Sequence, residues 1–500
     1  MFFDRGATAD YDAWKELGNP GWGWDDLLPY FKKSENFTPA AEKFAQEWDI
    51  SWDISVHGFS GAVQSSYPVF QWSYLKSFFD GWYSLGLTTP KDPGSGNKTG
   101  VFWAPSTLNP KDETRSYSRT AHYDRVIQSR PNYHLLTNNA GHKIVIEEGR
   151  GVGVTFIHRE SLEVKTVKAT KEVILAAGSI HSPQILQLSG IGSRVSLRRL
   201  GIEPIYHLPG VGQNFQDHPT LYPNFDFQSI PVPNIGTLTS NATYAAEQLE
   251  LYWSQRQGPY TIVTHGGNTV AFLSLQELTP DYQRIINFAA SQRLSGLYTE
   301  SIDRTVMAGY KAQRSLILRL YNSTLSPVQE IKWNGETAMP LTLVKPLSRG
   351  SVSINSSDQL KPPVIDFGTL ADPTDLETLI AALRINRALM ASSPMQELSP
   401  VELSPGANLT TDAELRDALR SLLLPTFSHP CCTCSMMPRN LGGVVGPDLL
   451  VYGVEGLSIV DASIMPLIPA THTSSTVYAI AEKAAVLIQE RHGLKARQWL

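Results

Sequence analysis

The stretch that most constrains the fold is residues 172–192, "EVILAAGSIHSPQILQLSGIG". Its first part is a continuous apolar run, which predicts a parallel strand covered on both faces. A glycine turn follows, and then a helix with Ser182 as N-cap, Pro183 at its first position and Gly190 at its C-terminal end. A buried strand, a glycine turn and a helix N-terminus together favour binding of the phosphates of a nucleotide cofactor.

The neighbouring sequence predicts the other elements of an α/β protein. Apolar and polar residues alternate over 143–148, 151–159 and 163–169, which predicts an antiparallel meander. The segment 220–427 combines helix candidates with strand candidates and is interpreted as an inserted α+β domain; its clearest helix is 375–390 and a strand is expected within 342–355. Toward the C-terminus, a strand within 456–466 precedes an amphipathic helix within 474–493.

Composition excludes several classes of function. The chain has 500 residues, a net charge of −5 and a sequence pI near 6.2, so it lacks the basic surface that nucleic acid or an anionic membrane requires. No apolar run reaches about 18 residues, so no membrane span is expected. Asp4 and Arg5 stand where a signal peptide needs apolar residues, so no targeting segment is expected in this chain. Six Asn-x-Ser/Thr sites would suit a glycosylated secreted protein.

All three cysteines lie in "SHPCCTCSMMP", residues 428–438. The spacing of Cys431 and Cys434 is that of a zinc half-site or a redox pair, and His429 could add a third ligand. A structural zinc ion needs four ligands, however, and the sequence has no second cysteine pair. The segment after Cys434 also does not continue as the helix that a redox pair requires. We therefore expect no metal site here.

The pattern of motifs resembles the glucose-methanol-choline (GMC) flavoprotein oxidoreductases. Residues 178–192 fit each defined position of the family's second signature, and blocks such as 5–35, 210–219, 346–355 and 451–466 are similar to the family in the expected order. Within the family, the sequence resembles the fungal aryl-alcohol oxidases and glucose oxidases. The resemblance implies an FAD-binding, Rossmann-like domain and an α+β substrate domain with an antiparallel sheet.

The resemblance also implies a division of the chain and a departure from the family. Residues 1–20, 100–220 and 428–500 are expected to form the FAD-binding domain, and residues 21–99 and 221–427 the substrate-binding domain. Family members begin with a strand, a Gly-x-Gly-x-x-Gly turn and a helix that hold the ADP half of FAD. Residues 3–12 here resemble the end of the first signature. The N-terminal βαβ unit is therefore expected to be missing from this sequence.

The resemblance assigns catalytic roles to two histidines. His429 matches the position of the catalytic base, and an imidazole with a pKa near the working pH suits that role. His472 matches the second active-site position, which hydrogen-bonds the substrate oxygen. His181 lies at a variable position of the second signature, and no function is expected for it.

The resemblance and the local pattern together assign cofactor contacts. Ala177 and Gly178 end the buried strand, where a large side chain would block the cofactor. The helix after His472 is expected to begin with Ser474 or Ser475 as N-cap, and its positive end would stabilise reduced flavin. The full set of expected FAD-binding residues is Gly141, Ala177, Gly178, Asp461, Ala462, Thr473 and Ser474. Asn214, Asp217 and His218 could either cover the flavin or hold a turn.

The predicted function is FAD-dependent oxidation of an alcohol, with hydride passing to the flavin and His429 accepting the proton. An aromatic or secondary-metabolite alcohol is the expected substrate, and oxygen or a quinone the electron acceptor. Two alternatives stay open: a non-redox, FAD-containing cyclase of a biosynthetic pathway, and an inactive truncated member. Cys432, at a position that is usually glycine in the family, leaves the cyclase alternative open. The protein is expected to be secreted if a leader precedes residue 1, and otherwise cytoplasmic.

Overall fold

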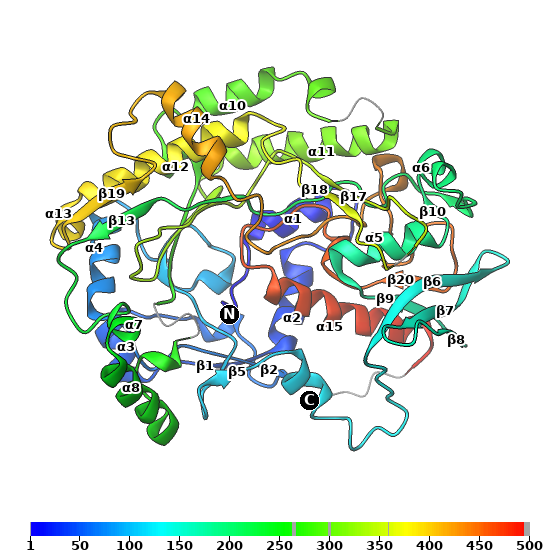
Figure 1. Cartoon of the computed structure of the whole chain (residues 1–500), viewed down its shortest axis with the longest axis horizontal. Helices are drawn as coiled ribbons and strands as arrows, with labels where there is room; N and C mark the ends of the chain where they lie inside the picture. The colour runs from blue at the N-terminus through cyan, green and yellow to red at the C-terminus, as the bar shows by residue number, and fades with distance from the viewer. Residues whose placement is uncertain (1, 263–266, 299–301, 359, 495–500) are drawn as a thin grey trace.

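The protein is described here by a computed structural model that covers residues 2–262, 267–298, 302–358 and 360–494 (Figure 1). Two parallel strands, β9 (Val173–Leu175) and β20 (Leu457–Ile459), pair in register and lead at the same edge into the turns before α5 (Gly178–Leu188) and α15 (Ser474–Arg491). The strand predicted after residue 172 is therefore parallel, as expected. It is covered on one face only, because Ile174 points outward and is 48% exposed.

The predicted meander is confirmed. β6 (Asn139–Glu147), β7 (Arg150–His158) and β8 (Val164–Lys168) form an antiparallel sheet in that order beside β9. The pairing of β6 with β7 shifts register after Gly141 and again after Val145. These bulges occur where α5 packs against β6.

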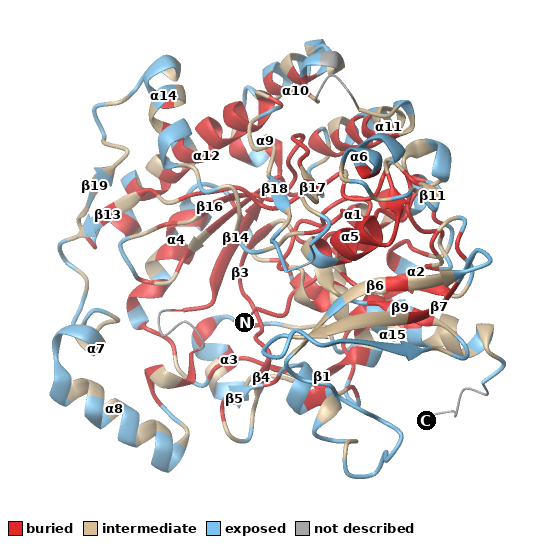
Figure 2. Cartoon of the chain, turned by 45° about the vertical axis from the view of Figure 1, so that its right-hand side comes forward, coloured by how far each residue is buried: buried red, intermediate tan, exposed pale blue. Residues whose placement is uncertain are grey.

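A second sheet forms the centre of the other half of the molecule, where Figure 2 shows its strands as buried. Its order is β12-β16-β15-β14-β3, and every neighbouring pair is antiparallel. The strands are β12 (Thr220–Leu221), β16 (Leu341–Leu343), β15 (Gln329–Trp333), β14 (Thr269–Leu273) and β3 (Gly100–Trp103). Helices α12 (Thr374–Ala391), α4 (Lys76–Ser84) and α9 (Leu275–Leu278) pack on it.

The expected helix at 375–390 is α12, but the expected strand within 342–355 is interrupted. Residues 341–343 belong to β16, and the chain pairs again only at β17 (Ser351–Ser353), with β18 (Val364–Asp366). The break occurs because the backbone N–H groups of Leu347 and Ser348 donate to the carboxylate of Asp375 rather than to a strand. β3 pairs with β14, and α2 (Trp24–Ser34) packs on α15; the division into two domains stays a prediction.

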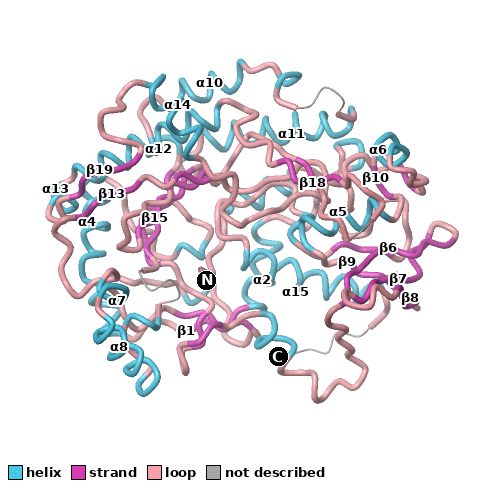
Figure 3. The backbone as a smooth tube through the Cα atoms, in the orientation of Figure 1, coloured by secondary structure: helices cyan, strands magenta, loops and turns pink. Residues whose placement is uncertain are grey.

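The remaining elements surround these two sheets, and long loops cross the middle of the molecule (Figure 3). The remaining α-helices are α1 (Thr8–Glu16), α3 (Glu42–Trp48), α6 (Arg194–Arg199), α7 (Thr237–Ser240), α8 (Ala242–Gln255), α10 (Tyr282–Ser291), α11 (Arg304–Tyr321), α13 (Ser393–Gln396) and α14 (Asp412–Leu422). The short strands are β1 (Glu35–Thr38), β2 (Val63–Ser66), β4 (Leu108–Asn109), β5 (Thr114–Arg115), β10 (Ile191–Gly192), β11 (Tyr206–His207), β13 (Asn224–Phe227) and β19 (Pro400–Ser404). Among the described residues, no helix is long and apolar enough to cross a bilayer.

The N-terminal helices are fixed to the C-terminal segment by buried aromatic residues. The Tyr11 hydroxyl lies 2.9 Å from the hydroxyl of Thr476, and Trp14 Nε1 donates to the carbonyl of Leu467 at 2.9 Å. Both rings are fully buried. A buried aromatic ring contributes apolar area, and its polar atom needs a partner, so these bonds fix the register of α1 against the segment that carries α15.

A buried histidine makes ion pairs on both sides of its ring. His57 Nδ1 lies 3.0 Å from Glu35 Oε2 and its Nε2 lies 2.9 Å from Asp92 Oδ2, while the ring stacks on Phe37. Arg5 donates to the same Glu35 oxygen at 2.8 Å. Burial by itself lowers the pKa of His57, but the hydrogen bonds to Asp92 and Glu35 outweigh burial and hold the pKa above 6.5.

This geometry predicts a pH dependence of stability. Because the pKa of His57 is higher in the folded than in the unfolded protein, its contribution is complete below about pH 6.5 and is lost as the pH rises through the folded pKa. We expect His57→Gln to remove that loss when urea unfolding is measured between about pH 6 and pH 9. His134→Asn, at an exposed histidine, is the matched control. An identical fall in stability in wild type and His57→Gln would contradict the prediction.

Candidate active site

One buried carboxylate holds the loop that carries His429. Asp217 Oδ1 accepts the backbone N–H of His218 at 2.7 Å, of His429 at 3.0 Å and of Phe427 at 3.2 Å. Its Oδ2 accepts the hydroxyl of Thr426 at 2.5 Å. Of the two roles that the sequence left open for Asp217, the structure shows that it holds a turn. The hydrogen bond from His429 to Asp217 also joins two segments that are 212 residues apart in the sequence.

Three imidazole rings meet at this loop. The Nδ1 atoms of His218 and His429 lie 2.9 Å apart. The ring centroids of His429 and His472 are 5.5 Å apart, with an angle of 87° between the planes. The structure therefore brings the two predicted catalytic histidines together and adds His218, which the sequence assigned only to a cover or a turn.

His472 is buried just before α15, between two carboxyl groups. Its Nδ1 lies 3.0 Å from Asp4 Oδ1, and its Nε2 lies 3.5 Å from Glu330 Oε1. Asp4 also forms an ion pair with Lys98, which is fully buried. Neither carboxyl oxygen of Glu330 has a hydrogen-bond partner among the residues that the structure describes. Glu330 is thus a buried acid whose nearest basic group is the His472 ring.

Burial sets the protonation states around the rings. Burial, with the nearby His472, lowers the pKa of His429 to about 3. Burial also lowers the pKa of His218 well below its usual value, and the neighbouring His429 lowers it further. In the opposite sense, burial raises the pKa of Glu330. At neutral pH, therefore, His218 and His429 are neutral imidazoles, each with one N–H and one free lone pair.

Aromatic rings lie beside the histidines. The Phe2 ring meets the His472 ring edge-on, with centroids 4.8 Å apart. The Phe427 ring lies 5.5 Å from that of His429 and 6.3 Å from that of His472. The site therefore combines imidazoles with apolar, aromatic surface.

The turn after β9 has the expected residues but an earlier helix start. α5 begins at Gly178 with Ala177 as N-cap, so the prediction of Ser182 as N-cap was wrong and Pro183 lies inside the helix. Gly178 has a φ of +81°, which lets the chain enter the helix directly from the strand. The Ser182 hydroxyl accepts the N–H of Ala177 at 3.1 Å and donates to Asp461 Oδ2 at 2.5 Å. At the other end, the predicted glycine follows the C-cap residue of α5.

Asp461 links the end of β20 to this turn. Its Oδ2 accepts the N–H of Gly178 at 2.9 Å, and its Oδ1 accepts the N–H of Ser463 at 2.8 Å. The carbonyl of Ala462 accepts the N–H of Cys432 at 3.1 Å. Two of the predicted cofactor residues thus connect both strand ends to the His429 loop.

The start of α15 also differs from the prediction. Thr473 is the N-cap and Ser474 the first helical residue, and Thr473 makes no side-chain capping bond. The prediction of Ser474 or Ser475 as N-cap was wrong because the hydroxyl of Ser475 donates to the carbonyl of Asp4 instead. The first backbone N–H groups of a helix carry partial positive charge, and here they follow directly after His472.

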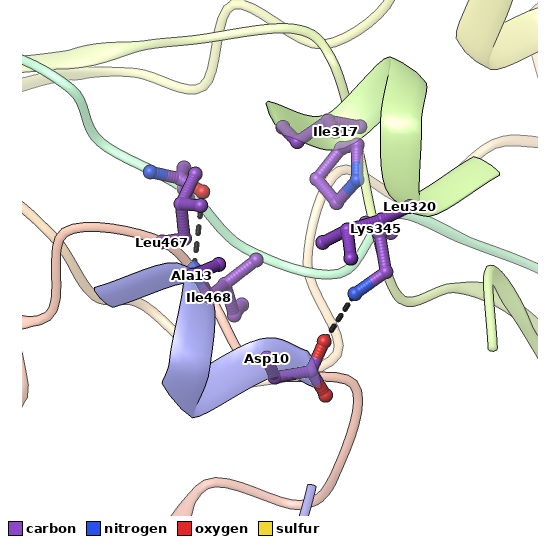
Figure 4. A pocket seen from close by; sticks show the side chains of 9 residues that line it. Asp10, Ala13, Ile317, Leu320, Lys345, Leu467 and Ile468 are labelled. Carbon is purple, nitrogen blue, oxygen red and sulfur yellow. Dashed lines mark hydrogen bonds and ion pairs between the residues drawn. The ribbon is translucent and has the colours of Figure 1, made fainter. Parts of the chain in front are cut away.

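A small cavity lies beneath the segment that leads to His472 (Figure 4). It has about 10 Å³ of space, close to the volume of one water molecule. Lys345 pairs with Asp10 at its edge, and Asp10 Oδ2 accepts the N–H of Ala470 at 3.0 Å. This contact fixes the segment to α1 in a tightly packed interior that has no room for a substrate.

The cysteines pack inside the protein. Cys431, Cys432 and Cys434 are all fully buried and free. Cys432 has a φ of +76°, a conformation that favours glycine. Within the described parts of the chain, no group of three or more His, Cys, Asp or Glu residues could hold a metal ion.

A larger cavity of about 410 Å³ lies between β6 and α5. Gly141, Ala177, His181 and Gln184 are among the residues that line it. Two predicted cofactor residues therefore share one cavity. His181, for which no function was expected, joins them there, and its Nδ1 lies 2.8 Å from Gln184 Oε1.

Comparison with known proteins places the chain among oxidoreductases. Family models described as GMC oxidoreductase match residues 1–220 and 346–481. Dehydrogenase xptC of Emericella nidulans is 39% identical over 495 residues, which are 99% of this chain and 79% of that protein. Patulin synthase of Aspergillus clavatus is 29% identical over 97% of this chain and 75% of its own length.

Comparison with solved structures also places the chain among oxidoreductases. An FAD-dependent oxidoreductase from Chaetomium thermophilum superposes with a TM-score of 0.97 at 42% identity, over 99% of this chain and 85% of its own. A fungal aryl-alcohol oxidase superposes with a TM-score of 0.93 at 35% identity, over 99% and 84%. The fold and its relatives define an enzyme of the FAD-dependent oxidoreductase class. The chain belongs to the GMC oxidoreductase family.

The residues present fit parts of FAD. No atom lies within 4 Å of the point where a Cβ on Gly178 would stand, so a ligand can approach the backbone closely there. The buried hydroxyl of the next residue, Ser179, has no partner among the described residues. Together with the cavity at Gly141, these features suit the adenosine end of the cofactor.

Three polar residues near the histidines were missed by sequence reasoning. Asp4 and Lys98 contact the site through ion pairs across the fold. Lys98 lies in none of the quoted motifs, and Asp4 lies within residues 3–12 but was assigned no side-chain role. Glu330 also gave no clear sequence signal, because β15 has the sequence QEIKW and its burial is set by tertiary packing.

The role of Asp217 can be tested directly. Asp217→Ala leaves three backbone N–H groups and the Thr426 hydroxyl without their acceptor, so we expect a loss of about 3 kcal/mol in unfolding free energy. Asp226→Ala, at an exposed aspartate in β13, should change it by less than about 0.5 kcal/mol. Urea unfolding monitored by tryptophan fluorescence measures both. Equal, small effects would show that the loop does not depend on Asp217.

Proposed function

We propose that the protein oxidises an alcohol to the corresponding carbonyl compound, with an aromatic alcohol as the substrate class. The observation that carries this proposal is the pair His429 and His472, whose rings lie 5.5 Å apart and perpendicular. One imidazole can take the hydroxyl proton while the other hydrogen-bonds the same oxygen.

His429 can accept a proton because its ring is unprotonated at neutral pH. Burial and the nearby His472 lower its pKa to about 3, which is below the value near the working pH that best suits a general base. Two neutral imidazoles with Nδ1 atoms 2.9 Å apart share one proton between them. When Nδ1–H of His429 donates to His218, Nε2 of His429 keeps the lone pair that accepts the hydroxyl proton. In this proposal His218 is the acceptor that holds His429 in the basic tautomer.

His472 suits the role of hydrogen-bonding partner to the substrate oxygen. Burial alone would raise the pKa of Asp4, but Lys98 and His472 outweigh burial and hold it well below its usual range. Asp4 is thus an acceptor only, and Nδ1–H of His472 donates to it. Nε2 is left for Glu330 or for the substrate oxygen, and it can donate to that oxygen only when it also carries a proton.

The aromatic side chains support the substrate class. Phe2 and Phe427 lie against the two catalytic candidates, and aromatic rings favour edge-to-face or offset contacts with a bound aromatic ring. The solved aryl-alcohol oxidase at 35% identity supports the same class.

FAD, when bound, would supply the acceptor for the hydride that leaves the alcohol carbon. We propose that Gly141, Ala177 and Gly178 hold its adenosine end. Asp461 and Ala462 would then lie beside the pyrophosphate, and Thr473 and Ser474 beside the flavin, where the positive end of α15 stabilises negative charge. Asp461 contributes by fixing the backbone of this site through its own hydrogen bonds.

The proposal predicts the effect of removing the base. His429→Ala should lower the rate of flavin reduction by an aromatic alcohol by about 10²- to 10⁴-fold without loss of bound FAD. Anaerobic stopped-flow absorbance of the flavin measures that rate, and His134→Asn serves as the control. Subsequent mixing with oxygen or with a quinone identifies the electron acceptor.

Other outcomes would count against the proposal. A protein that binds FAD yet shows no flavin reduction with any alcohol of a broad panel is not an alcohol oxidase. Product mass separates the cyclase alternative, because oxidation removes two hydrogens whereas dehydrative cyclisation removes water and leaves the flavin oxidised. A chain that binds no FAD after reconstitution supports the inactive alternative.

The positioning role of His218 makes a separate prediction. His218→Phe removes the partner of His429 Nδ1, so we expect kcat to fall about 10- to 100-fold with little change in KM. His218→Asn, whose amide oxygen can accept the same N–H, should recover part of the rate. If His218→Asn is as slow as His218→Phe while both fold and bind FAD, packing rather than the hydrogen bond explains the effect.

A further inference from the structure

Two adjacent thiols lie in the loop that carries His429 and take no part in the proposed reaction. The Sγ atoms of Cys431 and Cys432 are 2.9 Å apart, and both residues are fully buried. A disulfide bond is about 2.05 Å long, so closing the gap requires each sulfur to move only about 0.4 Å. The pair is thus already close to the bonded arrangement.

The backbone is held in a conformation that keeps the pair together. The N–H of Cys431 donates to the carbonyl of Gln216 at 2.9 Å, and the N–H of Cys432 donates to the carbonyl of Ala462 at 3.1 Å. Between these two anchors, Cys432 has a φ of +76°, which costs a non-glycine residue about 1–2 kcal/mol. Glycine would adopt this turn without strain. A strained residue at this position is a reason to look for a function of its side chain.

We propose that Cys431 and Cys432 form a reversible disulfide between adjacent residues, a redox modification site next to His429. The oxidant is a hydroperoxide. One thiolate attacks hydrogen peroxide, giving a sulfenic acid and hydroxide, which takes up the proton released by that thiol to form water. The second thiol then displaces water from the sulfenic acid, so two thiols and one peroxide give one disulfide and two waters.

The surroundings make oxidation of the pair slow. Burial raises the pKa of the Cys431 thiol, and the neighbouring Cys432 raises it further. Thiols in this state react slowly. Cys434 is separate from the pair in the sequence, and its backbone N–H donates to the carbonyl of Ser463 at 2.8 Å. It therefore provides an internal control in the same loop.

Mass spectrometry tests the proposal without relying on catalysis. The FAD-reconstituted full chain is reduced, exposed to hydrogen peroxide, quenched in acid, and alkylated with N-ethylmaleimide after denaturation. Tryptic peptide 421–439 contains all three cysteines. We expect three adducts before oxidation, and afterwards one adduct, on Cys434, with a loss of about 2 Da from the other two residues. Methionine oxidation adds oxygen and cannot imitate this loss.

Matched variants identify the bonded pair. Cys434→Ala should still lose both remaining alkylation sites on oxidation. Cys432→Gly, which relieves the backbone strain and is expected to fold, should keep both of its remaining thiols, and so should Cys431→Ala. Three adducts after oxidation, oxygen added to either thiol, or a bond that includes Cys434 would each overturn the proposal.

Closure should also alter catalysis, a consequence that rests on the proposed function. The disulfide would lie two residues from His429, so we expect its formation in wild type to lower the rate of alcohol oxidation about tenfold. Reduction with dithiothreitol should restore that rate. The rate of Cys432→Gly should change with neither treatment. An unchanged rate in protein shown by mass to be closed overturns this coupling. No alcohol oxidation in the reduced protein counts instead against the proposed function, and leaves the mass result standing.

Discussion

The arrangement of the site depends on buried carboxylates that accept hydrogen bonds from segments far apart in the sequence. Asp217, Asp461 and Asp10 each accept at least two backbone N–H groups, and each joins two distant segments. Removing a carboxylate from water costs several kcal/mol, so such residues persist only where charge-assisted hydrogen bonds replace its hydration. These bonds are directional, and they therefore fix loops that hydrophobic packing alone would leave loosely defined.

The same principle governs the chemistry around the rings. Asp4 is ionised because Lys98 and His472 compensate its burial, whereas burial without such a cation raises the pKa of Glu330. Two acids on opposite sides of one imidazole thus have opposite protonation tendencies. This difference between the two acids lets the His472 ring hold a proton firmly on the Asp4 side and exchange one on the Glu330 side. The apolar rings of Phe2 and Phe427 lie against the imidazoles, and a less polar environment strengthens these interactions.

Sequence reasoning found what local motifs encode and missed what only the tertiary structure creates. The strand before Gly178 and helix 375–390 were recognisable, because each belongs to a pattern contained within about 20 residues. The two catalytic candidates were assigned only through the resemblance to the GMC family. The N-cap at Ser182 was wrong because Asp461, 279 residues away, takes the Ser182 hydroxyl as a donor. Asp4 could not be assigned, since its partners Lys98 and His472 are 94 and 468 residues away.

The ion pair between Asp4 and His472 has a consequence for biosynthesis. These residues lie 468 positions apart, and the contacts of Tyr11 and Trp14 span similar distances. A ribosome releases the N-terminal part long before the C-terminal part exists, so the first helices must wait without their partners while most of the chain is made. The arrangement around His472 can form only after α15 has been translated. Until then, the exposed aromatic surface of the first helices is open to chaperones and to aggregation.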